Sequence, residues 1–198
     1  MPCNDSMNDF TLFLGKFFKH GTAIASVAPS SRWLSRLTVH NIDWDNAGTL
    51  VELGGGTGPI TRAIAERVRP GCRVIVVERD PDFATLLRER FRQRTNFEIV
   101  QGDAGDLISI LGDRGIASVD HVISGLPVPS FRKSLQESLF RAVGTLLRPE
   151  GTFNQITEIP WLYKRLYQRH FQDVQFVLEP RNMPPAGTYF CRRPRAGG

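Results

Sequence analysis

Cysteine is scarce in this sequence, and long apolar runs are missing. Cys3, Cys72 and Cys191 lie far apart, with no metal-binding or redox spacing, so we expect reduced thiols rather than a disulfide or a metal site. No stretch approaches the roughly 20 consecutive apolar residues of a membrane-spanning helix. The first ten residues lack the basic start and apolar run of a secretory signal. These absences predict an intracellular protein without a transmembrane helix.

Lysine is also scarce, because 21 of the 25 basic residues are arginine. The net charge is +5, and the planar guanidinium group of arginine suits phosphate recognition. An anionic membrane surface, a nucleic acid and a merely arginine-rich composition all fit this pattern. The 198 residues, of which 41% are hydrophobic and 23% charged, match one soluble domain of ordinary size.

Short apolar runs alternate with helical segments after Gly48, which predicts an α/β fold. Strands are expected at 49–53, 73–77, 97–100, 119–124, 152–156, 174–178 and 188–191. Helices are expected at 30–37, 60–68, 81–92, 134–147 and 161–170. This order predicts a doubly wound, mostly parallel sheet whose last two strands form an antiparallel hairpin at one edge.

A glycine-rich turn follows the first predicted strand. Gly54, Gly56 and Gly58 give the spacing G-x-G-x-G, preceded by Glu52. The dinucleotide fingerprint requires G-x-G-x-x-G, and Pro59 stands at its third glycine position. The turn therefore argues against a nicotinamide cofactor, while still allowing a ligand to approach the backbone closely.

Two further strand ends carry acidic side chains. Glu78 ends the second strand, where a carboxylate can accept hydrogen bonds from both hydroxyls of a ribose. Asp103 and Ala104 follow the third strand, where a side chain and backbone amides can read an adenine edge. Each feature has a simpler interpretation as an ordinary turn. Together, and in this order, they predict a nucleoside cofactor.

With these residues, positions 22–192 resemble the class I S-adenosylmethionine-dependent methyltransferases, and E-x-G-x-G-x-G at 52–58 looks like the first motif of that family. The resemblance implies a Rossmann-like sheet of seven strands. It also implies that Glu52 orients the methionine end of S-adenosylmethionine. The implied cofactor-binding residues are Glu52, Gly54, Gly56, Gly58, Glu78, Asp103, Ala104 and Ser124.

Two segments, 21–31 and Ser124-Gly125-Leu126-Pro127, are similar to bacterial phospholipid N-methyltransferases, which convert phosphatidylethanolamine to phosphatidylcholine. The rRNA adenine dimethyltransferases share this arrangement with an Asn-Leu-Pro-Tyr variant. A methyltransferase that acts on a base needs an Asn or Asp side chain to accept a hydrogen bond from the exocyclic amine, and an aromatic ring to stack on the base. This sequence has Ser124 and Val128 at those two positions instead. The resemblance therefore favours lipid over RNA, and another aminolipid, such as an ornithine lipid, stays open.

The first 28 residues are expected to form an amphipathic helix and arm, with the methyltransferase domain at 29–198. Apolar residues at helical spacing, with lysines at the far end, suit a helix lying in a membrane interface, although such a stripe also suits packing on the core. The residues expected at substrate or membrane are Phe10, Phe13, Lys16, Phe17, Lys19, Leu126 and Pro127. The expected partner is a phospholipid at an anionic surface, on the inner face of the cell membrane. Nucleic acid is disfavoured, and no obligate protein partner is indicated.

Methylation of an amine requires its neutral form, so a general base is expected near the strand ends. Glu158, Tyr163 and Tyr189 are the candidate catalytic residues, and spacing singles out none of them. An arginine is expected at the lipid phosphate, and Arg32, Arg132, Arg165 and Arg181 remain alternatives.

Overall fold

The computed structural model describes residues 31–158 and 163–195. Its elements, in chain order, are α2 (Arg32–Thr38), β1 (Thr49–Leu53), α3 (Pro59–Ala65), β2 (Arg73–Glu78), α4 (Pro81–Phe91), β3 (Phe97–Gln101), η1 (Ala104–Asp106), α5 (Leu107–Gly112), β4 (Val119–Ser124), η2 (Val128–Ser130), α6 (Lys133–Leu146), β5 (Leu147–Thr157), α7 (Lys164–His170), β6 (Phe171–Glu179) and β7 (Ala186–Pro194).

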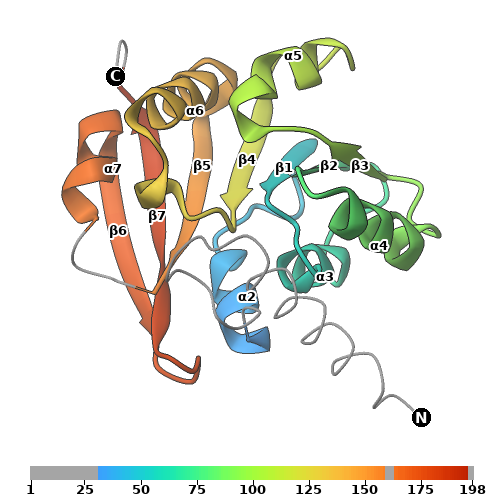
Figure 1. Ribbon diagram of the computed structural model, residues 1–198, viewed down its shortest axis with the longest axis horizontal. Coiled ribbons are helices and arrows are strands. Elements are labelled where there is room, and N and C mark those ends of the chain that lie inside the picture. The colour runs from blue at the N-terminus through green and yellow to red at the C-terminus, as the bar shows by residue number, and fades with distance from the viewer. Residues whose placement is uncertain (1–30, 159–162, 196–198) are drawn as a thin grey trace.

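The strands form one seven-stranded sheet in the order β3-β2-β1-β4-β5-β7-β6 (Figure 1). Strands β1 to β5 pair in parallel, and β7 pairs antiparallel with both β5 and β6. The order reverses between β1 and β4, which makes this boundary the switch point of a doubly wound sheet. The predicted fold class is confirmed, including the terminal antiparallel pair at one edge.

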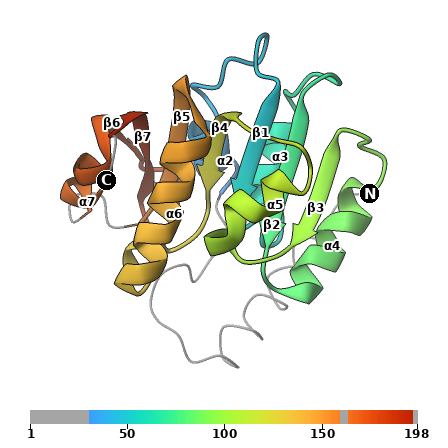
Figure 2. The same cartoon turned by 90° about the horizontal axis from the view of Figure 1, so that it is seen from above.

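Helices cover both faces of the sheet because its central strands are apolar on both sides. One apolar cluster joins the sheet to α5, α6 and α7 through residues such as Leu111, Phe140 and Tyr167. A second joins it to α3 and α4 through residues such as Ile64 and Leu87. Figure 2 shows α5 and α6 on the near side of the sheet, with α2 and α3 behind it. No helix in the described part of the chain is long and apolar enough to cross a membrane.

Helix α3 ends earlier than predicted, strands β6 and β7 are longer than predicted, and two further elements differ more. Strand β5 begins at Leu147 and continues through Pro149 and Gly151, where the sequence predicts only the end of a helix. The register between β4 and β5 shifts between Val119 and His121, so the Pro-Glu-Gly segment is accommodated as an irregularity in the strand. Helix α5 is a six-residue helix that the sequence analysis did not predict.

The loops that leave the parallel strands are joined at the carboxyl edge by backbone hydrogen bonds. The Gly54 amide donates to the Val77 carbonyl, and the Gly125 amide donates to the Leu53 carbonyl. The Gly102 amide donates to the carbonyl of Glu78. Each bond extends the strand ladder by one step, so the loops after β1, β3 and β4 start from fixed positions.

Candidate functional site

The loop between β1 and α3 is built from glycines that adopt left-handed backbone conformations. Gly54, Gly56 and Gly58 have φ of 76°, 52° and 85°. A Cβ at Gly54 would lie 2.5 Å from the Leu126 side chain, whereas a Cβ at Gly56 would meet nothing within 4 Å. The loop thus packs against the β4 loop at one point and leaves open space at another, where a ligand can approach the backbone.

Glu52 is a fully buried carboxylate on β1, two residues before the first of these glycines. Neither carboxylate oxygen has a hydrogen-bond partner of normal geometry. Burial raises the pKa of Glu52 to about 8. Weak hydrogen bonding to Thr61, outside normal geometry, lowers the pKa, and the neighbouring Glu78 charge raises it. An unpaired buried carboxylate is costly, so this side chain is suited to receiving a positively charged ligand group.

Glu78 lies at the end of β2 and is nearly buried. Its Oε2 accepts a hydrogen bond of 2.8 Å from the Gly56 amide, and its Oε1 accepts one of 2.8 Å from the Asp80 amide. These bonds fix the carboxylate beside the glycine loop. Each oxygen keeps a second lone pair, so the group can still accept hydrogen bonds from a diol.

Asp103 caps the short helix η1 after β3. Its Oδ1 accepts a hydrogen bond of 2.8 Å from the Gly105 amide, and its Oδ2 lies 3.8 Å from Arg79 Nη1. The Asx turn that the sequence offered as a simple interpretation is therefore present, and it holds Asp103 beside the nearly buried Ala104.

The loop after β4 is held by a residue that the sequence analysis missed. The Gln155 amide on β5 donates to the carbonyls of Ser124, Leu126 and Ile156, at 3.3, 2.8 and 2.9 Å. The Ser124 hydroxyl is buried and accepts from the Leu126 amide. Leu126 packs against Gly54, and Pro127 is exposed. A polar residue in the middle of an apolar strand was the only sequence signal for Gln155.

The three candidate catalytic residues occupy different environments. Glu158 follows β5 at the carboxyl edge, is partly buried, and has its pKa raised by that burial. Tyr163 is also partly buried and precedes α7. Tyr189 is fully buried in the core, where its ring lies 4.8 Å from that of Tyr167. This position favours a packing role for Tyr189, and the catalytic roles of Glu158 and Tyr163 stay predictions.

The four arginines predicted as alternatives for the lipid phosphate are exposed, and those at 32 and 181 lie over the Trp33 ring. The apolar residues and lysines predicted at the membrane lie outside the described part of the chain; they are Phe10, Phe13, Lys16, Phe17 and Lys19. Within the described residues, no cluster of three His, Cys, Asp or Glu side chains is suited to a metal ion.

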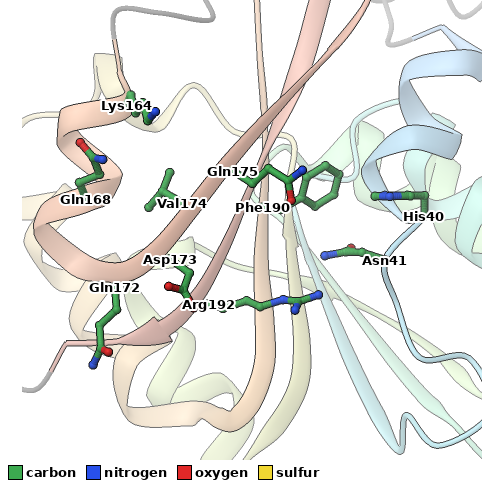
Figure 3. A pocket seen from close by; sticks show the side chains of 10 residues that line it. All are labelled: His40, Asn41, Lys164, Gln168, Gln172, Asp173, Val174, Gln175, Phe190 and Arg192. Atoms are coloured by element: carbon green, nitrogen blue, oxygen red, sulfur yellow. The ribbon is translucent and has the colours of Figure 1, made fainter.

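A separate polar pocket of about 520 Å³ lies over the β6–β7 pair, between α7 and the end of α2. Figure 3 shows Lys164 and Gln168 on one side and His40 near Phe190 on the other, with Arg192 extending toward Asn41. None of the predicted site residues lines it, so the candidate site is at the carboxyl edge instead.

The carboxyl-edge residues fit a nucleoside cofactor with a charged tail. Gly56 leaves open space beside the backbone, and Glu78 presents a fixed carboxylate next to that space. Glu52 supplies a buried carboxylate without a partner, which a ligand ammonium would satisfy. Ligands bind at this edge of doubly wound sheets, and the arrangement follows that rule.

Comparisons with known proteins indicate a methyltransferase family. A family profile described as a methyltransferase domain matches residues 50–151. An ornithine lipid N-methyltransferase from Singulisphaera acidiphila is 69% identical over 94% of this chain and 97% of its own length. A probable ribosomal RNA small subunit methyltransferase A from Methanosarcina acetivorans is 34% identical over 40% of this chain and 26% of its own length. Fibrillarin from Aeropyrum pernix, solved with bound S-adenosyl-L-methionine, has a TM-score of 0.59 at 16% identity, covering 73% of this chain and 66% of that one.

Proposed function

This chain belongs to the class I S-adenosylmethionine-dependent methyltransferases, and we propose that it methylates the headgroup amine of an ornithine lipid. The observation that carries the proposal is the 69% identity to an ornithine lipid N-methyltransferase over nearly the full length of both chains. At the coarser level, the same match supports N-methylation of an aminolipid with S-adenosylmethionine as the methyl donor.

Phosphatidylethanolamine is the second candidate substrate. It is favoured by the segment Ser124-Gly125-Leu126-Pro127, which is similar to that of phospholipid N-methyltransferases. Both headgroups present a primary amine beside an anion, which is a carboxylate in ornithine lipid and a phosphodiester in phosphatidylethanolamine. An arginine suits either anion, so the substrate assignment between them rests on the comparison.

The residues at the carboxyl edge would each contact a different part of S-adenosylmethionine. Bound S-adenosylmethionine supplies its methyl group as part of a sulfonium, for in-line attack by a neutral amine. Glu52 would face the ammonium of its methionine end, and Glu78 would accept hydrogen bonds from the ribose hydroxyls. Asp103 and Ala104 would contact the adenine. Holding the two reactants in line supplies several kcal/mol of the acceleration.

The substrate ammonium must lose a proton before its nitrogen can attack the methyl group. A primary ammonium has a pKa of about 10, so the protonated form dominates near neutral pH. Glu158 would accept this proton, because a carboxylate with a raised pKa is a stronger base than an exposed one. The Ser124–Pro127 loop, fixed by Gln155, would shape the entrance through which the amine reaches the methyl group.

Methyl transfer from labelled S-adenosylmethionine to vesicles that contain ornithine lipid and phosphatidylethanolamine in equal amounts tests the proposal. After lipid extraction and separation, we expect label in methylated ornithine lipid. Label only in methylated phosphatidylethanolamine would replace ornithine lipid with the second candidate. No labelled lipid, with cofactor binding confirmed in the same sample, would refute aminolipid methylation.

A further inference from the structure

The loop of residues 180–185 between β6 and β7 is fastened to the start of α2. The Asn182 side chain is buried; its Oδ1 accepts a 3.0 Å hydrogen bond from the Ser31 amide, and its Nδ2 donates to the Pro184 carbonyl. Arg181 forms a two-pronged ion pair with Glu179, with both N–O distances 2.7 Å. These contacts hold the loop in one conformation although most of its residues are exposed.

The fastened loop and α2 together present an apolar and aromatic surface edged by arginine. The Arg181 guanidinium lies 4.1 Å from the centre of the Trp33 ring, and that of Arg32 lies 4.6 Å from it. Met183 is 78% exposed, although it is a large apolar side chain. We call Arg32, Trp33, Arg181 and Met183 the Trp33–Met183 surface.

This surface lies at the same edge of the sheet as the candidate active site. Glu179 pairs with Ala186, and Thr157 at the carboxyl end of β5 pairs with Gly187. The loop therefore joins β6 to β7 where β5 ends. Figure 1 shows it projecting beside α2 at the bottom of the view. A flat partner that contacts the loop would also face the edge that carries the cofactor loop.

We propose that the Trp33–Met183 surface docks the enzyme on an anionic lipid bilayer, with Met183 entering the interface and Arg32 contacting the headgroups. The inference rests on the proposed lipid substrate and goes beyond it, because it assigns the orientation on the membrane to described residues outside the cofactor site.

Charge and side-chain type favour a bilayer as the occupant. Arg32 and Arg181 outnumber Glu179 on the surface, and the whole chain carries +5. Basic residues gain affinity near anionic headgroups, and tryptophan rings sit favourably at the level of the headgroups. Exposed methionine adapts to an irregular apolar environment. Since the loop is already ordered by Asn182, docking requires little further loss of conformational freedom.

Two exposed positions test the proposal without disturbing the core. Met183→Glu places a charge where the side chain would enter the bilayer, and Arg32→Glu reverses the charge at the headgroups. The matched control is Ile108→Glu, because Ile108 is 47% exposed on α5, at the opposite end of the molecule in Figure 1. Sedimentation with neutral phosphatidylcholine vesicles, and with vesicles that also contain about 30% phosphatidylglycerol, measures binding.

We expect Met183→Glu to bind both kinds of vesicle at least about fivefold more weakly than the wild type. Arg32→Glu should lose a similar factor only on the anionic vesicles. Ile108→Glu should bind as the wild type does. Met183→Glu and Ile108→Glu should also keep the wild-type affinity for S-adenosylmethionine and the wild-type rate on a short-chain aminolipid dissolved as monomers.

Equal vesicle binding by Met183→Glu, Arg32→Glu and the wild type would overturn the inference and leave the surface to another kind of partner. This outcome is distinct from failure of the proposed function. If no aminolipid, dissolved or in vesicles, accepts a methyl group, the substrate assignment fails, whereas the binding measurements still decide the docking surface.

Discussion

At the scale of single residues, the Glu52 carboxyl links folding, pH and cofactor binding. Burial raises its pKa from 4.5 to about 8, so the folded apoprotein holds this proton more tightly than the unfolded chain does. The resulting stabilisation is fully present below about pH 4.5 and is lost as the pH rises toward 8. The cofactor ammonium favours the ionised form, so binding should release a proton.

We therefore expect the free energy of unfolding of the wild type to fall by a few kcal/mol relative to Glu52→Gln between about pH 5 and pH 8. Urea titrations of the two apoproteins at several pH values measure this difference. Calorimetry near pH 7, in buffers with different ionisation enthalpies, should detect proton release on cofactor binding by the wild type and not by Glu52→Gln. Parallel pH dependences for the two proteins would contradict the assignment.

Glu158 carries a second prediction, about rate rather than stability. As a general base it must be ionised, and burial raises its pKa, so activity should be lost as the pH falls through that raised value. Glu158→Gln should lower kcat by about 100-fold and remove this acidic limb from the pH–rate profile. Glu150→Gln, at the exposed opposite end of β5, is the matched control and should behave as the wild type does. An unchanged profile for Glu158→Gln would exclude this role.

The sequence predicted the positions of Glu52, Glu78 and Asp103 because each follows from where a strand ends. It did not predict that both Glu52 oxygens are buried without partners, since that depends on α3 and β2 packing around them. Gln155 was missed for the same reason. Its three acceptors include two carbonyls about 30 residues away in the chain, and only the folded sheet brings them together.

At the scale of elements, helix α2 is attached to the sheet by buried polar contacts. Asn154 Nδ2 on β5 donates 2.8 Å hydrogen bonds to the Thr38 carbonyl and to Asn41 Oδ1. The Thr38 and Thr188 hydroxyls are 2.9 Å apart, which adds a contact to β7. Since α2 also carries Trp33, these contacts fix the position of the Trp33–Met183 surface.

Asn154→Ala should lower the free energy of unfolding by about 1–3 kcal/mol, because it removes two hydrogen bonds and leaves buried acceptors unsatisfied. Asn46→Ala is the control, since Asn46 also donates a 2.8 Å hydrogen bond but is exposed. That variant should lose less than about 0.5 kcal/mol. Urea midpoints measure both, and equal losses would show that the contact from β5 does not hold α2.

The strands were predictable because apolar runs bounded by turns mark them, and their order limits the topology. Element ends were less predictable. Pro149 and Gly151 predict the end of a helix. Strand β5 nevertheless continues through them, because β4 supplies pairing partners on either side of the irregularity. Helix α5 has only six residues and its burial depends on α6 and the sheet, so its sequence carries little periodic signal.

At the scale of the whole molecule, the excess of arginine is compatible with either a lipid or an RNA substrate. Ser124 and Val128 are both fully buried, so the places where a base methyltransferase presents an amine acceptor and a stacking ring hold inaccessible side chains. RNA should therefore bind only through its phosphates, and such binding weakens steeply with salt.

We expect structured RNA to slow aminolipid methylation at about 50 mM salt and to have little effect at about 300 mM, because RNA binding depends on counterion release. Vesicle docking should persist in part at the higher salt, since Met183 contributes through apolar contact. A labelled-methyl assay with vesicles and RNA in one tube, divided into organic and aqueous fractions, measures both acceptors. Label that enters RNA and survives at high salt would assign the arginines to a nucleic acid substrate, whereas label confined to the organic fraction at both salts places the lipid at the active site.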